Sequence, residues 1–180
     1  MRVIGGRYGG RELIAPRGRA TRPTSDRVRE ALFSILADVS GARVLDLFAG
    51  SGALAIEALS RGAASATLVD SGGPAVSAIR RNLQALELEA EVVRQPVIRF
   101  LGRARADARL YDLVFADPPY RHAGSLSAEL TASLAPVLAP AARVVTESDR
   151  RDPLDLGLDL RDERRYGDTL IRIHTATPDQ

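Results

Sequence analysis

The stretch Arg43-Val44-Leu45-Asp46-Leu47-Phe48-Ala49-Gly50-Ser51-Gly52 decides the fold, because an apolar strand pattern passes directly into a glycine-rich turn. Residues 43–47 read as a buried strand, and a helix pattern begins at residue 53. Glycines in the turn let the backbone approach a ligand closely, and the amides that start a helix point into the same space. The stretch therefore predicts a strand, a ligand-binding turn and a helix.

The same alternation of strand and helix continues to residue 147. Strands are expected at 43–47, 66–70, 90–94, 111–116 and 142–147, and helices at 53–61, 74–86, 97–104 and 125–135. Beyond them, 159–165 and 170–175 read as two strands joined by a turn at residues 166–168. We predict an α/β, Rossmann-like fold: a mainly parallel seven-stranded sheet with helices on both faces and a C-terminal antiparallel pair.

The N-terminal segment differs in composition from the rest of the chain. Gly5-Gly6 and Gly9-Gly10 permit the turns of a small hairpin, and a helix begins near Thr24 or Ser25, either of which can cap it. One face of that helix is expected to pack inward through Val28, Ala31, Leu32, Ile35 and Leu36, with Arg27, Arg29 and Glu30 turned away. We predict a basic hairpin or arm over 1–24, followed by the main domain over 25–180.

The charge is concentrated at the same end of the chain. All 25 basic residues are arginine, and residues 1–30 hold eight of them against three acids, whereas the remaining 150 residues are slightly acidic. A basic arm on an acidic body is typical of a protein that docks a polyanion. The chain has no cysteine, two histidines, no apolar run of transmembrane length and no signal-peptide pattern, so we expect a cytoplasmic monomer without a metal or a membrane partner.

Two acids accompany the glycine-rich turn. Asp70 closes the second expected strand, where a carboxylate suits the hydroxyls of a ribose. Gly50, Gly52 and Ala55 followed by Asp70 also satisfy the dinucleotide fingerprint, so a nicotinamide cofactor is an alternative. Asp46 weighs against it, because a carboxylate there would repel a pyrophosphate but attract an ammonium group.

A second motif, Asp117-Pro118-Pro119-Tyr120, follows the apolar residues 113–116 at the carboxyl end of a strand. The two prolines fix the backbone and donate no hydrogen bond. The tetrad therefore offers fixed acceptors and an aromatic face, which suit a planar base with an exocyclic amine.

Together these motifs resemble a known family along nearly the whole chain. Asp46–Gly52, Asp70 and Asp117–Tyr120 are similar to the donor loop, ribose-binding acid and target-amine motif of class I S-adenosylmethionine-dependent amino-methyltransferases. More specific are the segments 2–6, 22–33, 45–52, 57–62 and 166–169, which resemble the RsmD family of bacterial ribosomal RNA methyltransferases. That resemblance implies transfer of a methyl group from S-adenosylmethionine to N2 of guanine 966 in 16S rRNA, on the 30S subunit.

The resemblance also implies roles for individual residues. The cofactor-binding set is Asp46, Phe48, Ala49, Gly50, Ser51, Gly52, Asp70, Ser71, Gln95 and Val97. Where relatives often carry an acid that touches adenine, this chain has Gln95-Pro96, which leaves Gln95 or the Val97 amide for that contact. Asp117 and the carbonyl of Pro118 would accept the N2 hydrogens, with Pro119 fixing the turn and Tyr120 stacking on the base. The arginines expected to bind RNA phosphates are Arg7, Arg11, Arg17, Arg19, Arg22, Arg27, Arg29 and Arg121.

Two other functions remain open beside the nicotinamide enzyme. The tetrad also suits the amine of adenine, as in N6-adenine DNA methyltransferases, although 180 residues leave little room for a target-recognition domain. A non-catalytic RNA-binding assembly factor on the same fold is the other alternative. The intact tetrad weighs against it.

Overall fold

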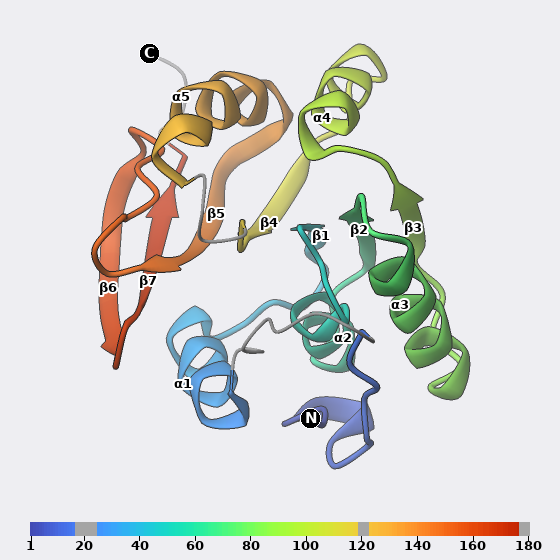
Figure 1. Cartoon of the computed structure of the whole chain (residues 1–180). Coiled ribbons are helices and arrows are strands. Elements are labelled where there is room, and N and C mark those ends of the chain that lie inside the picture. Colours follow the sequence, from blue (N-terminus) through green and yellow to red (C-terminus); the bar gives the residue numbers. More distant parts are fainter. Residues whose placement is uncertain (17–24, 119–122, 177–180) are drawn as a thin grey trace.

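Seven strands form one sheet, in the order β3-β2-β1-β4-β5-β7-β6 (Figure 1). The computed structural model describes residues 1–16, 25–118 and 123–176. The strands are β1 (Arg43–Leu47), β2 (Ser65–Asp70), β3 (Glu91–Arg94), β4 (Tyr111–Ala116), β5 (Leu138–Asp149), β6 (Asp159–Tyr166) and β7 (Thr169–Thr175). The helices are α1 (Asp26–Leu36), α2 (Ala53–Ser60), α3 (Gly73–Ala85), α4 (Val97–Ala106) and α5 (Ala123–Leu134), with short 3-10 turns η1 (Gly6–Tyr8) and η2 (Ala135–Val137).

The pairing of the strands confirms the predicted sheet. Neighbouring strands from β3 to β5 run parallel, β7 pairs antiparallel with β5, and β6 pairs antiparallel with β7. The fold class predicted from the sequence is therefore correct. The largest boundary difference is β5, which begins at Leu138 rather than near residue 142, because a register shift after Tyr111 lets the earlier residues rejoin β4.

Each face of the sheet is covered by its own helices. Side chains of α1, α2 and α3 pack on one face with Val44, Leu68 and Phe115. Side chains of α4 and α5 pack on the other with Leu45 and Val114. Figure 1 shows α4 and α5 above the strands and α1 and α2 below them. Across the described ranges, none of the helices has the length and apolar character that crossing a membrane requires.

The N-terminal segment forms the predicted hairpin. Val3 N donates to Arg11 O at 2.9 Å and Leu13 N donates to Met1 O at 2.9 Å, with η1 making the turn. Val3 and Leu13 are buried in the same hydrophobic cluster as α1, α2 and α3. Residues 1–13 therefore share the core of the main domain. A boundary at residue 24 stays a prediction.

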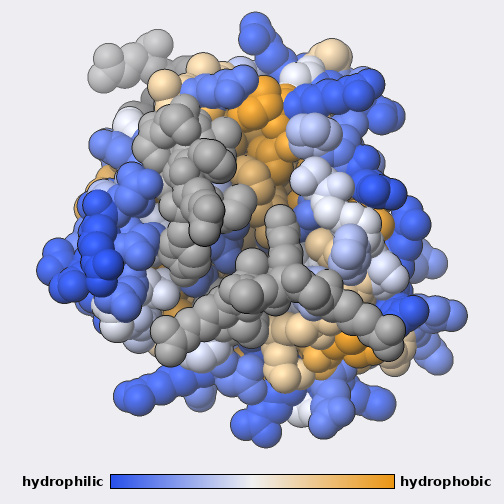
Figure 2. Space-filling view, viewed as in Figure 1, coloured by the Kyte–Doolittle hydropathy of each residue, from blue (hydrophilic) through white to orange (hydrophobic). Residues whose placement is uncertain are grey.

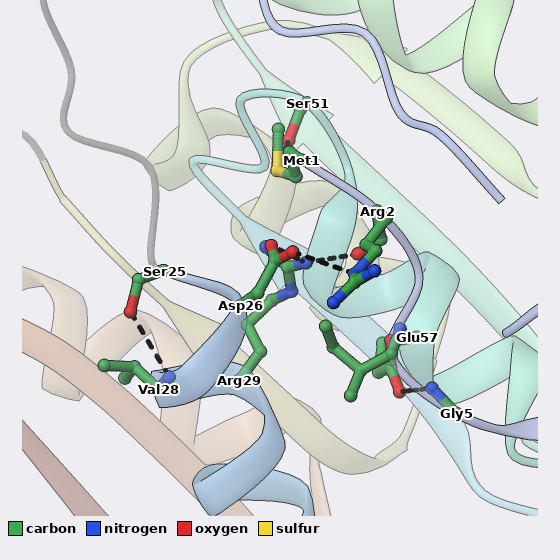
Figure 3. A network of polar contacts seen from close by, with 10 residues as sticks. Met1, Arg2, Gly5, Ser25, Asp26, Val28, Arg29, Ser51 and Glu57 are labelled. Atoms are coloured by element: carbon green, nitrogen blue, oxygen red, sulfur yellow. Dashed lines mark hydrogen bonds and ion pairs between the residues drawn. The ribbon is translucent and has the colours of Figure 1, made fainter. Parts of the chain in front are cut away.

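Helix α1 begins as predicted, but one of its faces was assigned wrongly. Ser25 caps it, because its Oγ accepts a hydrogen bond from Val28 N at 3.3 Å. Arg29, which was expected to face outward, is 1% exposed, and Phe33 is buried as well. The reason is that the hairpin covers this second face of α1: the guanidinium of Arg29 donates to the carbonyl of Arg2 and to Asp26 (Figure 3).

Candidate active site

The predicted site residues come from the carboxyl ends of neighbouring strands. Residues 48–52 follow β1, Asp70 ends β2, Gln95 follows β3, and Asp117 follows β4. Because β1 lies between β2 and β4, the strand order reverses at β1, and α/β folds bind ligands at such a switch point. The sheet topology therefore brings the glycine-rich loop, Asp70 and Asp117 to one end of the sheet.

Strand register places four carboxylates on one face of that end. Asp46 pairs with Leu68 on one side and with Phe115 on the other, and all three point toward α1, α2 and α3. Side chains alternate along a strand, so Asp70 and Asp117, two residues after Leu68 and Phe115, point the same way. Glu147, two residues after Val145 on β5, joins them.

The loop after β1 needs glycine at two positions for different reasons. Gly50 has φ of +58°, and a Cβ built there meets only Phe48 O, at 3.9 Å, so the backbone at this residue borders open space. Gly52 has φ of +77°, and its Cβ would lie 2.8 Å from Leu68 Cδ2, in the core. The loop is thus anchored in the core at Gly52, whereas its backbone is open at Gly50. An open backbone is what a ligand needs in order to contact main-chain groups.

Asp70 holds this loop in place. One carboxylate oxygen accepts from Gly50 N at 3.0 Å and the other accepts from Gly72 N at 2.7 Å. The side chain is 3% exposed. Asp70 therefore shapes the loop through Gly50, a role that the sequence did not reveal, in addition to the ribose contact that remains a prediction.

The carboxyl of Asp46 is buried and carries an unusual pKa. Burial away from water raises the pKa of this carboxyl to about 8. A hydrogen bond from Ala55 N at 3.2 Å lowers the pKa, and the nearby charge of Asp70 raises it further. The folded chain therefore binds a proton here that the unfolded chain releases above about pH 4. Between about pH 4 and pH 8 this group makes the free energy of unfolding fall as the pH rises.

The carboxyl of Asp117 is similarly perturbed. Burial raises its pKa well above the ordinary value, and the charges of Glu147 and Asp46 raise it further. Glu147 is 6% exposed and was missed by the sequence analysis. The sequence pointed to Glu147 only through its position: it is an acid in an alternating strand pattern, and that strand ends on the same side of the sheet as Asp117.

The remaining donor-loop and adenine candidates lie around the same end of the sheet. Phe48 is half-buried with φ of +61°, Ala49 is half-buried, Ser51 is buried, and Ser71 is exposed. Val97 begins α4, and the Nε2 of the half-buried Gln95 has no hydrogen-bond partner among the described residues. A buried donor without a partner fits the predicted contact with an acceptor nitrogen of adenine.

The phosphate-binding candidates fall into three groups. Arg7, Arg11 and Arg27 are exposed. Arg29 is buried and engaged by Asp26 and Arg2, so it is not available to a phosphate. The third group lies outside the described residues and consists of Arg17, Arg19, Arg22 and Arg121. Pro119 and Tyr120 of the predicted tetrad lie outside the described residues as well.

The face of the molecule seen in Figure 2 is mixed in character. Hydrophobic side chains reach the surface between α5 and α4 and again in the lower part of the view, and hydrophilic side chains occupy most of the outer rim.

Comparisons with known proteins agree with this geometry. The family model described as "Conserved hypothetical protein 95" matches residues 1–175. The "Ribosomal RNA small subunit methyltransferase D" of Escherichia coli K12 is 45% identical over 123 residues, which cover 67% of this chain and 61% of that protein. The matched segment thus spans less than two thirds of that relative.

One solved structure is similar to this chain over nearly its full length, and another over most of it. The Escherichia coli protein yhhF superposes with a TM-score of 0.86 at 36% identity, covering 99% of each chain. SMU.776, solved as a complex with SAH, shares the fold at 18% identity with a TM-score of 0.70, over 84% of this chain and 49% of that one. Because the family model of conserved hypothetical protein 95 matches this chain nearly from end to end, the chain belongs to that family, the RsmD family.

Proposed function

We propose that this protein transfers a methyl group from S-adenosylmethionine to the N2 amine of guanine 966 in 16S rRNA, acting on the small ribosomal subunit in the cytoplasm. The observation that carries the proposal is the placement of Asp117, at the end of β4, beside the glycine loop and Asp46, at the end of β1. Family membership and the name of the Escherichia coli relative support the rRNA substrate. The guanine and its position rest on the resemblance alone.

The residues around β1 suit the methyl donor. The acid at Asp46 pairs with the ammonium of the methionine moiety, and Asp70 accepts from the ribose hydroxyls. Gln95 or the amide of Val97 contacts adenine, and the open backbone at Gly50 lets the ligand approach closely. When bound, S-adenosylmethionine supplies a methyl group attached to a positively charged sulfur.

Asp117 and its turn hold the base. The lone pair of guanine N2 is delocalised into the ring, so transfer needs an in-line approach and acceptors that favour charge on nitrogen. The Asp117 carboxylate and the Pro118 carbonyl accept the two N2 hydrogens, and the ring of Tyr120 stacks on the base. A bound S-adenosylmethionine would supply the methyl group, its carbon–sulfur electron pair would stay on sulfur, and the methylated amine would then release one proton to water. The exposed arginines at 7, 11 and 27 bind RNA phosphates.

Transfer of radiolabelled methyl groups to 30S subunits that lack this modification tests the proposal. We expect label in 16S rRNA, and mapping of the modified nucleotide should give N2-methylguanine at position 966. Label in adenine of DNA would favour the alternative N6-adenine activity. Binding to subunits without any transfer would favour a non-catalytic assembly factor.

Replacement of Asp70 by alanine is expected to weaken S-adenosylmethionine binding by about one to two orders of magnitude. The change removes the predicted ribose acceptor and releases Gly50 N and Gly72 N, and each lost hydrogen bond to a charged group is worth about 1.5–3 kcal/mol. Isothermal titration calorimetry measures the affinity. An unchanged affinity would contradict both the ribose contact and the loop-holding role.

Donor binding near pH 6.5 is expected to release about one proton from Asp46. The pKa of the buried carboxyl is about 8 without ligand, and an ammonium group beside it lowers that pKa. Affinity should therefore rise as the pH rises toward 8. Calorimetry in buffers of different ionisation enthalpy counts the released protons. The Asp46→Asn protein, which has no proton to lose there, is the control, and the same release from that variant would contradict the assignment.

A further inference from the structure

Asn82 is a buried polar residue on the apolar face of α3, and no step of the proposed function uses it. It is 1% exposed and lies among Ile79, Leu83 and other core residues of the helix. Its Oδ1 accepts from Ile14 N at 2.8 Å, and its Nδ2 donates to Ile14 O at 3.0 Å and to Ser51 O at 2.9 Å. One side chain thus joins the end of the N-terminal hairpin to the donor loop.

These three bonds use both Nδ2 hydrogens and one acceptor site of the Asn82 amide. Asn82 pairs with Ile14 through one acceptor and one donor, as one peptide group pairs with another across strands, and its second Nδ2 hydrogen goes to Ser51. An aspartate has the same shape but no hydrogen to donate. The site therefore requires asparagine for a reason other than packing.

The loop residue that Asn82 holds is the one between the two glycines. Gly50 and Gly52 both have positive φ, and glycine is the residue with the greatest backbone freedom. Asp70 fixes Gly50 N from the β2 side, at 3.0 Å. Among the described residues, Ser51 itself is held by the bond to Asn82 and by a contact of its Oγ with Met1 Sδ at 3.6 Å, and Figure 3 shows Met1 beside Ser51. Both restraints lead to the hairpin.

We propose that Asn82 is a positioning residue for methyl-donor binding, which transmits the docked position of the hairpin at Ile14 to the donor loop at Ser51. The identity of the donor rests on the proposed function. Three residues after Ile14, the sequence reaches Arg17, the first of the arginines 17, 19 and 22 that are proposed to bind RNA. Because coupling between two sites is reciprocal, RNA held by that segment and donor held by the loop should each strengthen binding of the other.

Calorimetric titration of full-length proteins with S-adenosylmethionine tests the role. In Asn82→Asp, two donated hydrogen bonds are lost at constant side-chain shape, and we expect the Kd to rise about tenfold or more. Ser60→Ala is the matched control. Ser60 is also buried and bonds the hairpin, accepting from Tyr8 N at 2.9 Å and donating to Gly5 O at 2.5 Å, and among the described residues neither of these bonds reaches the loop. Its Kd should stay within about twofold of the wild-type value.

Two further readouts separate positioning from a general loss of stability. With 30S subunits, Asn82→Asp should raise the KM for S-adenosylmethionine while kcat stays within about twofold. Ile14→Pro removes the N–H that donates to Asn82 and fixes φ at residue 14, and it should raise the Kd in the wild-type background but add nothing in the Asn82→Asp background.

The outcomes distinguish the two levels of proposal. Equal affinities of the Asn82→Asp and Ser60→Ala proteins would overturn the positioning role, as would an unchanged Kd in Ile14→Pro. Failure of the wild-type protein to bind S-adenosylmethionine would overturn the proposed function itself. Methylation of a different nucleotide by a wild-type protein that binds the donor would alter the proposed target and leave the role of Asn82 standing.

Discussion

Replacement of Asp117 by asparagine is expected to lower the rate of methyl transfer by about 10²- to 10⁴-fold. In its ionised form, the carboxylate of Asp117 accepts a hydrogen from N2 and favours the positive charge that develops on that nitrogen, whereas an amide of the same shape does so only weakly. The position of Asp117 next to β4, apart from the residues that hold Gly50, predicts that donor affinity stays within a few-fold. Single-turnover transfer of labelled methyl groups to 30S subunits measures the rate.

A control on the same strand isolates this effect. Asp112, near the opposite end of β4, is partly exposed and pairs with Arg43 at 2.9 Å. Asp112→Asn should leave the transfer rate close to that of the wild-type protein. Near-normal turnover in Asp117→Asn would contradict the catalytic role, and a matching loss in both variants would indicate a general effect on folding.

Replacement of Glu57 by alanine is expected to destabilise the folded protein by about 3–5 kcal/mol, as breaking a buried ion pair does. Glu57 lies on α2 and is 0% exposed. It accepts from Ile4 N at 2.7 Å, from Gly5 N at 2.9 Å and from Arg61 Nε at 2.7 Å. Alanine would leave two partly buried amides and one guanidinium without this acceptor.

Equilibrium urea unfolding and thermal melting measure the loss. For a chain of this size the melting temperature should fall by about 10 °C. Glu89→Ala, at an exposed position, is the control and should change the free energy of unfolding by less than about 0.5 kcal/mol. A Glu57→Ala protein as stable as the control would mean that the hairpin docks without this carboxylate.

Periodicity and turn residues were enough to predict most of the fold. The strands β1 and β4 begin and end where the apolar patterns do, because both are buried on two faces and read as short apolar runs. The antiparallel β6–β7 pair was visible in its alternation around Gly167, which has φ of +64°. The early start of β5 was not visible, because it depends on a register shift against β4.

The residues that sequence reasoning missed are those whose partners lie far along the chain. Asn82 and Glu57 each interrupt the apolar face of a helix, and Arg29 lies on the polar side of a helix that a second element covers. Only tertiary contacts with the hairpin explain why these polar groups are inside. Asp46, Asp70 and Asp117 were found because the position of each at the end of a strand, rather than a distant partner, points to its role, whereas Glu147 was missed because it lies within the long strand β5.

The docking of the hairpin also has a consequence for the order of folding. Residues 1–14 leave the ribosome well before the partners that satisfy them, since Glu57 follows Gly5 by 52 residues and Asn82 follows Ile14 by 68. Contacts of such long sequence separation form late. Val3 and Leu13 therefore stay exposed to solvent during synthesis until α2 and α3 have emerged. In the finished protein, native-state hydrogen exchange should show the hairpin opening as one cooperative unit, at a lower free energy than the central strands.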